Sequence, residues 1–163
     1  MAKPFLLALS MIALAVAVSA QAPRQPVIER PSAPSPDRVP PKLEAVAETK
    51  LLMEGMAKPN IEGLAKLLKD KPTQAESWTF ARGQALLIAE TGNLLMLRPP
   101  KAKAAQEAWL ARSAEMRDAA SKLAKAAAAK DYLTARASLA NVANACNRCH
   151  ESFRVPTRIV PFE

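Results

Sequence analysis

The run Cys146–His150, near the C-terminus, constrains this chain more than any other feature. It reads Cys-Asn-Arg-Cys-His, and the C-x-x-C-H spacing is the attachment motif of c-type haem. Two thiols add across the two vinyl groups of a haem and become thioethers, and the histidine offers an imidazole nitrogen to the iron. On a helix, Cys146 shares a face with Cys149, three residues on, and with His150, four residues on. The motif therefore predicts one helical turn that carries a single covalent haem c.

Other uses of a cysteine pair fit this chain less well. A redox dithiol is expected in a βαβ context, and no stretch here has the pattern of a strand. A structural zinc site needs four ligands, whereas the chain has two cysteines and one histidine in total. A disulfide between Cys146 and Cys149 would close too short a loop to add much stability. Only seven of the 163 residues are Phe, Trp or Tyr, so a haem would supply much of the apolar core.

The N-terminus has the pattern of an export signal. Residues 1–20 contain a basic start at Lys3, an apolar run from Phe5 to Val18 and a small-residue cleavage site ending at Ala20. The apolar run is too short to span a bilayer comfortably. The alternative interpretation is that the segment stays uncleaved and anchors the protein to the membrane. We therefore expect a periplasmic protein with no integral membrane segment after cleavage. This agrees with the motif, because c-type haem is joined to protein outside the bacterial inner membrane.

Residues 21–42 form a linker, because they contain seven prolines. Proline fixes φ and removes a backbone donor, so the segment favours extended conformations. It either spaces the following domain from the membrane or trails in solution, and a Pro-rich recognition peptide is the alternative.

Residues 43–155 have a helical pattern. The first helix is expected over 43–57, with Val46, Met53 and Met56 at helical spacing, until Pro59 interrupts it. Asn60 is expected to cap a short continuation, and whether the interruption is a kink or a break stays open. The continuation has three apolar residues on one face: Ile61, Leu64 and Leu68.

Three more helices follow. A capping box starts the second at Thr73, and Pro99 and Pro100 end it. The third covers 102–129, and Asp131 is the expected N-cap of the fourth. The second helix has an apolar stripe of Trp78, Ala81, Ala85, Ile88, Gly92 and Leu95, the third of Ala105, Trp109, Met116, Ala119, Leu123 and Ala127, and the fourth of Tyr132, Ala135, Leu139, Val142, Cys146, Cys149 and Phe153.

Four amphipathic helices with short connections predict an all-α, antiparallel four-helix bundle. The haem cysteines fall on the apolar stripe of the last helix, so a haem attached there faces the interior. Residues 156–163 are expected to form a non-helical tail because they contain two prolines.

A four-helix chain with C-x-x-C-H near the end of its last helix resembles the class II c-type cytochromes, the cytochrome c′ family. The likeness covers residues 43–155, and the run Cys146–Arg154 is similar to that family's C-x-x-C-H-x-x-F-R ending. The resemblance implies that His150 is the proximal iron ligand and that Arg154 lies beside the haem on that side. The Pro-rich leader and Pro59 depart from the family pattern.

The resemblance also implies that the first helix crosses the other face of the haem. Members with a methionine there are six-coordinate, low-spin electron carriers, and members with an apolar residue are five-coordinate and bind NO or CO. Met53 is our first choice as sixth ligand because it lies mid-helix on the Val46 stripe, and Met56 is the second. Met96 and Met116 are expected to belong to the core.

These features predict a one-electron carrier that meets redox partner proteins, with a gas-binding cytochrome as the alternative. We expect no enzyme, because no nucleophile–base pair is evident. Residues 43–163 contain 18 basic and 13 acidic residues, a net charge of +5. That charge suits an acidic partner or an anionic membrane surface, or simply a solvated exterior. No aromatic-interleaved basic patch suggests nucleic acid binding. A homodimer is possible, because such bundles often dimerise.

The remaining charged residues have less specific expectations. Arg148 is expected to face solvent, with a haem propionate as its alternative partner. Arg82 and Arg98 are candidate propionate partners. Glu115 and Asp118 are expected to be ordinary surface carboxylates.

Overall fold

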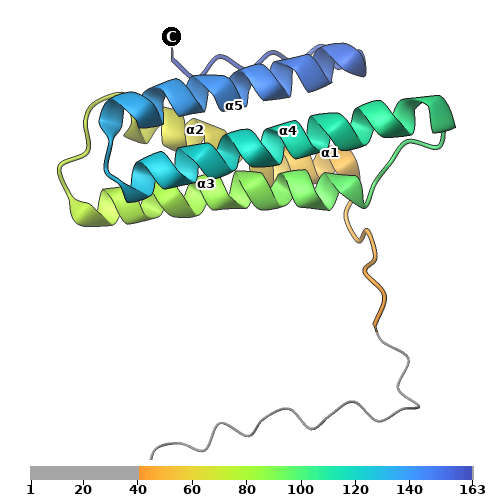
Figure 1. Cartoon of the computed structure of the whole chain (residues 1–163), viewed down its shortest axis with the longest axis horizontal. Helices are drawn as coiled ribbons and strands as arrows, with labels where there is room; N and C mark the ends of the chain where they lie inside the picture. Colours follow the sequence, from red (N-terminus) through yellow and green to blue (C-terminus); the bar gives the residue numbers. More distant parts are fainter. Residues whose placement is uncertain (1–40, 163) are drawn as a thin grey trace, which may run out of the picture. The chain divides into compact units, whose positions relative to one another are not determined.

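The protein is an antiparallel bundle of four helical rods in a computed structural model that describes residues 41–162 (Figure 1). The predicted signal segment and all but the end of the predicted linker lie outside the described residues. The elements are α1 (Thr49–Leu52), η1 (Met53–Ala57), α2 (Lys58–Leu67), α3 (Ala75–Met96), α4 (Lys103–Ala128) and α5 (Tyr132–Ser152). The first three follow one another without a break and form one rod. Residues 41–162 contain no strand, so the predicted fold class is confirmed.

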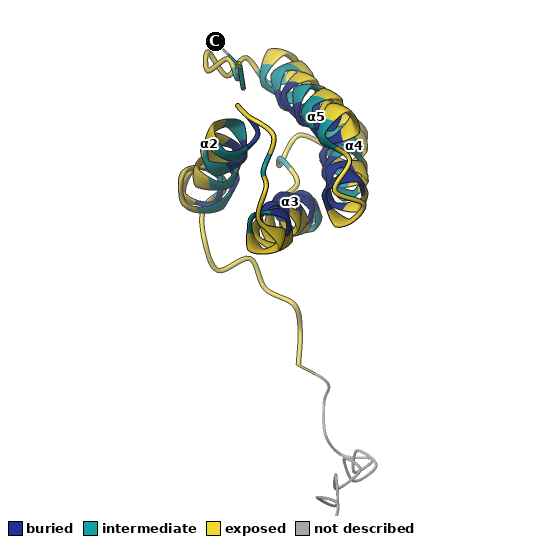
Figure 2. Cartoon of the chain, turned by 90° about the vertical axis from the view of Figure 1, so that its left-hand side faces the viewer, coloured by how far each residue is buried: buried dark blue, intermediate teal, exposed yellow. Residues whose placement is uncertain are grey.

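The core lies where the buried faces of the rods meet (Figure 2). Every member of the stripe predicted for α3 is buried, and so are Ala135, Leu139, Val142 and Cys146 of α5. Many of these residues are alanine or glycine, which lets backbones approach closely. At Gly92, a Cβ atom would lie 2.8 Å from the Ser113 carbonyl oxygen and 2.9 Å from the Arg117 backbone nitrogen. The pair α3–α4 has the most extensive contact in the bundle.

The first rod differs from the prediction at its start and at Pro59. It begins at Thr49, not at residue 43, and Val46 precedes it with 94% of its surface exposed. Val46 therefore shares no buried face with Met53. The segment before Thr49 stays outside the helix because Val46 and Leu43 are exposed and offer no core contact. Pro59 is the second residue of α2, and the helix continues through it, so it does not interrupt the rod.

A wide turn in η1 keeps both halves of the first rod facing the core. The buried residues of the rod are Leu52, Ala57, Ile61, Leu64 and Leu68, with a step of five residues between the first two. In a regular α-helix five residues turn well past one full rotation, so two residues five apart face different directions. Here the π-helical hydrogen bond from Lys58 N–H to the Met53 carbonyl closes a turn that contains one more residue, so Leu52 and Ala57 both face the core. The turn also precedes Pro59, whose ring would clash with the Gly55 carbonyl in a regular helix.

Two predicted N-caps are wrong. Asn60 lies inside α2. Its side chain donates a hydrogen bond to the carbonyl of Met56, a residue of the wide turn, at 2.7 Å. The helix α3 begins at Ala75 with Gln74 as N-cap, and no side chain caps it. The residues before α3 are held instead by the Trp78 indole N–H, which donates to the Pro72 carbonyl at 3.1 Å.

Both later helix ends carry the same chain-reversing motif. After α4, Asp131 N–H bonds to the Ala126 carbonyl and Lys130, with φ 54°, adopts the left-handed conformation. After α5, Val155 N–H bonds to the His150 carbonyl and Arg154 has φ 57°. This is the Schellman pattern. Asp131 then accepts from Thr134 N–H at 3.1 Å, which confirms it as the N-cap of α5.

The second reversal turns residues 155–162 back along α5, and we call this segment the C-terminal strap (Figure 1). It contains no helix, as predicted. Its Ile159 and Phe162 pack against the core. Among the described residues, no helix combines the length and the apolar character needed to cross a bilayer.

Candidate haem site

The last two turns of α5 present the C-x-x-C-H motif at one end of the bundle. Cys146 points into the core, with 6% of its surface exposed. Cys149 is half-buried and lies close enough to Arg112 and Glu115 of α4 to interact electrostatically with them. His150 is half-buried on the other flank of Cys146, beside the strap. The helix thus brings the two thiols and the imidazole together within one turn, with Cys146 between the other two.

Burial keeps both thiols neutral at ordinary pH. It raises the pKa of Cys146 to about 12, and the nearby Cys149 adds to this effect. Burial also raises the pKa of Cys149, although the Arg112 guanidinium opposes the shift. Both thiols are free. A thioether carries no charge, so the apolar surroundings that disfavour a thiolate suit a covalently attached haem.

The imidazole of His150 is arranged as an iron ligand would be. Its Nδ1 lies 2.7 Å from the Thr157 carbonyl oxygen. A carbonyl only accepts, so Nδ1 is the donor and carries the proton, which leaves the lone pair on Nε2. Metal-ligating histidines usually donate their other ring N–H in this way. The donor set of two thiols and one imidazole therefore fits a c-type haem.

The described residues leave only a small cleft at His150. Its volume is about 180 Å³, and its lining includes Asn147, His150 and Thr157. Ligand pockets generally have roughly 300 Å³ or more, so this cleft alone does not enclose a haem. The contacts between α2 and α5 are the sparsest of the neighbouring rods. The helix α5 therefore packs mainly on α4.

A chain of contacts places the start of the first rod at the same end of the bundle as the motif. The Arg98 Nε–H donates to the Ala47 carbonyl at 2.8 Å. Close by, the Trp109 indole N–H donates to the Leu95 carbonyl at 2.7 Å. The Trp109 ring meets the Phe153 ring edge-on, with centroids 5.1 Å apart. Figure 1 shows the result, with α1 and the C-terminal end of α5 at one end.

The candidate sixth ligands lie in the wide turn. Met53 begins η1 and Met56 is its fourth residue, and both are half-buried and packed against the core. Of the other two methionines considered, Met116 is buried with 5% of its surface exposed, and Met96 is half-buried at the end of α3.

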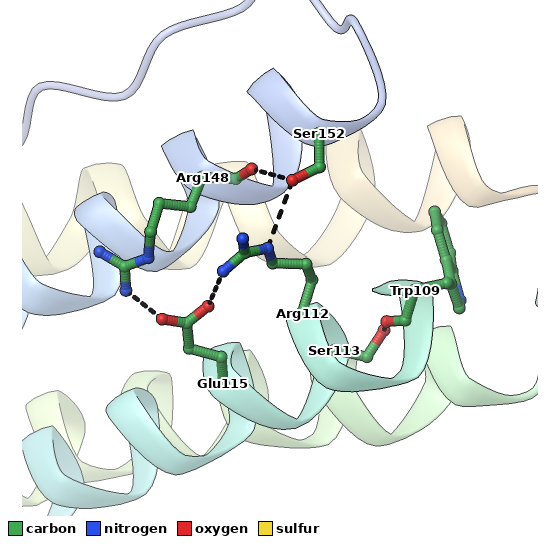
Figure 3. A network of polar contacts seen from close by, with 6 residues as sticks. All are labelled: Trp109, Arg112, Ser113, Glu115, Arg148 and Ser152. Carbon is green, nitrogen blue, oxygen red and sulfur yellow. Dashed lines mark hydrogen bonds and ion pairs between the residues drawn. The ribbon is translucent and has the colours of Figure 1, made fainter. Parts of the chain in front are cut away.

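An ion-pair network joins α4 to α5 across the motif (Figure 3). The Glu115 carboxylate accepts from Arg112 at 2.8 Å and from Arg148, inside the C-x-x-C-H run. Arg112 also donates to the Ser152 hydroxyl at 3.3 Å. The hydrogen bond from Arg148, followed by that from Arg112, lowers the pKa of Glu115. Glu115 is therefore more than the surface carboxylate that we expected, whereas Asp118 is exposed and pairs with its neighbour Arg117.

The other arginines named from the sequence do not line the cleft at His150. Arg82 is exposed on α3. Arg98 donates to the carbonyls of Ala47 and Leu94. The side chain of Arg154 is exposed after the left-handed turn. Sequence reasoning missed the strap contact from the Thr157 carbonyl, because a main-chain acceptor leaves no signal in residue type.

Comparison with protein families gives one match. The family model described as Cytochrome C' matches residues 99–154. Over these residues the match supports a class II c-type cytochrome. The matched region covers α4, α5 and the complete C-x-x-C-H motif, so the resemblance to cytochrome c′ is confirmed there, and α1 to α3 lie outside it. Members of this family carry a covalent haem c, typically one, and are typically periplasmic, which supports a monohaem c-type cytochrome. No curated protein and no solved structure matches the chain.

Proposed function

We propose that this protein is a periplasmic one-electron carrier whose single haem c is joined to Cys146 and Cys149 and ligated by His150 and Met53. The observation that carries the proposal is the convergence of two thiols and one imidazole on the last turns of α5, at the end of the bundle where the first rod brings its methionines. The haem iron supplies the chemistry by alternating between its ferric and ferrous states.

The two cysteines tether the group. Each S–H adds across one vinyl C=C bond, with sulfur bonding to one carbon and hydrogen to the other, so no oxidant is needed. Because Cys146 faces the core and Cys149 the α4 side, a haem held by both would lie against the bundle interior. The bundle would then exclude water from one side of the group, and the two tethers would fix its position relative to α5.

His150 is the proposed proximal ligand, and the Thr157 carbonyl supports this role because it leaves Nε2 available. Met53 is the proposed sixth ligand. A thioether favours the ferrous state and raises the reduction potential, which suits an electron carrier. Met56 is the second choice. Methionine is also a common core filler, and both side chains pack against the core, so a five-coordinate, gas-binding haem is the competing reading.

The partner would be another exported redox protein. The net charge of +5 over residues 43–163 favours a docking surface with acidic groups, since complementary charge speeds diffusional encounter. Rates of reduction by such a partner should fall as ionic strength rises.

Mass spectrometry and absorption spectroscopy of the protein made in a host that matures c-type cytochromes test the proposal. The polypeptide should carry the added mass of one haem, and Cys146→Ser or Cys149→Ser should weaken the attachment. The ferric protein should be low-spin, with the weak near-infrared band of sulfur–iron ligation. Met53→Ala should remove that band, and the matched variant Met56→Ala should retain it.

Each alternative gives a different result. Loss of the band only in Met56→Ala would exchange the two methionines. A high-spin ferric protein that binds CO rapidly without displacing a ligand would establish the gas-binding cytochrome. A polypeptide without haem mass would refute both functions.

A further inference from the structure

The C-terminal strap, residues 155–162, is bound to α5 by a two-point clip. The Asn147 side-chain amide donates to the Ile159 carbonyl at 2.9 Å, and the Ile159 N–H donates to the Asn147 side-chain oxygen at 2.8 Å. Both ends of one carboxamide are thus used on a single residue of the strap. Asn147 lies within the C-x-x-C-H run, so the clip is three residues from His150.

A second anchor holds the far end of the strap. The Arg136 guanidinium lies 3.9 Å from the centroid of the Phe162 ring, a cation–π contact. Arg136 also donates to the Leu68 carbonyl at 2.7 Å, which ties it to the end of α2. With the left-handed turn at Arg154, the strap is therefore fixed at its start, its middle and its end.

These anchors bring one strap carbonyl to the imidazole. The Thr157 oxygen lies 2.7 Å from His150 Nδ1, and Thr157 lies between the turn at Arg154 and the clip at Ile159. Thr157 is exposed, so packing of its own side chain does not explain the position of its carbonyl. The anchors on either side of Thr157 hold the carbonyl in place.

We propose that the strap positions the proximal haem ligand: Asn147 clips it to α5, and its Thr157 carbonyl holds and polarises the His150 imidazole. This inference rests on the proposed role of His150. A hydrogen bond from Nδ1 to a carbonyl fixes the ring orientation and makes Nε2 a stronger donor. A stronger donor stabilises the ferric state more than the ferrous state, so the strap lowers the reduction potential.

The test compares the full-length haem-containing protein with Asn147→Leu, which keeps the side-chain size and removes both clip bonds. Asn144→Leu is the matched control, since Asn144 is exposed on α5 one turn earlier. Ile159→Pro is the second variant, because it removes the amide donor from the strap side. Hydrogen exchange of the strap amides measures release of the strap, and a redox titration measures the consequence for the iron.

Both clip variants should speed exchange of the strap amides and raise the midpoint potential, and the control should change neither. Loss of a partner behind a metal ligand commonly costs about tenfold or more in metal affinity or activity, and we expect an effect of similar size on the balance between the two oxidation states. A tenfold shift in the ferric-to-ferrous ratio at fixed potential corresponds to about 59 mV for a one-electron couple.

Unchanged exchange in both variants would refute the clip. A released strap with an unchanged midpoint potential would refute the positioning role. Neither result touches the proposed function, which fails separately if the wild-type protein carries no haem or lacks histidine ligation.

Discussion

Gly92 and Gly83 lie on α3 nine residues apart and should respond oppositely to alanine. A Cβ atom at Gly92 would sit 2.8 Å from the Ser113 carbonyl oxygen, 2.9 Å from the Arg117 nitrogen and 3.0 Å from the Arg117 Cβ. The first two are backbone atoms of α4 and cannot move without moving the helix. At Gly83 nothing lies within 4 Å of the same position.

The expected energies follow from these distances. Carbon contacts are favourable at about 3.5–4.0 Å, so α3 and α4 must separate by roughly 0.5–1 Å around Gly92→Ala. Overpacking of this kind costs about 1–3 kcal/mol. Replacing a helical glycine by alanine contributes about 0.5–1 kcal/mol of stability. We therefore expect Gly92→Ala to lower the free energy of unfolding by up to about 2.5 kcal/mol and Gly83→Ala to raise it by about 0.5–1 kcal/mol.

Denaturant unfolding followed by far-UV circular dichroism measures both changes. The haem stays covalently attached in the unfolded chain, so the two variants share one reference state. If Gly92→Ala proved as stable as Gly83→Ala, the close approach of α3 to α4 at this point would be wrong.

Three further substitutions test individual contacts. Glu115→Gln should destabilise the fold by up to about 1 kcal/mol at neutral pH, because the network is partly solvent-exposed. The pKa of Glu115 is lowered in the folded state, so the difference from wild type should persist above about pH 4.3 and vanish as the pH falls through the lowered value. Asp131→Ala should lower the free energy of unfolding by removing the acceptor of Thr134 N–H, and Asp131→Asn should keep most of it. The hydrogen bonds with Thr134 lower the pKa of Asp131. Protonation of Asp131 in acid should therefore remove the difference in stability between the wild type and Asp131→Ala. The difference in stability between Asp131→Asn and Asp131→Ala should persist in acid, because asparagine does not titrate. Trp109→Phe should cost about 0.5–1.5 kcal/mol in thermal or denaturant unfolding, because the Leu95 carbonyl loses its indole donor; an unchanged midpoint would contradict that contact.

The sequence was most informative where periodicity and capping act locally. The stripes of α3 and α5 and the Asp131 cap were predicted because each depends on residues within a few turns of one another. The start of the first rod was missed, because Val46 fits the helical spacing but finds no core to pack against. The capping box at Thr73 was overridden by the contact of Trp78 with the preceding loop.

The same distinction between local patterns and tertiary contacts applies to the candidate site. The run Cys146–His150 was recognisable because thioether attachment dictates both residue type and spacing. The partners of that run were not. Glu115 meets Arg148 from another helix, and the Thr157 carbonyl meets His150 after a chain reversal. Both contacts depend on tertiary geometry, and neither leaves a pattern along the chain.

The wide turn η1 has a consequence for comparing this chain with other four-helix cytochromes. A chain with a regular α-helix at this point would present the same two inward faces with one residue fewer between Leu52 and Ala57. An ungapped comparison would then shift every earlier position by one residue, which is about 100° around the helix axis. Positions before the turn, Leu52 among them, would be matched to residues on the wrong face, and both methionines lie within the turn itself. Assigning a distal ligand by position therefore requires a one-residue gap here.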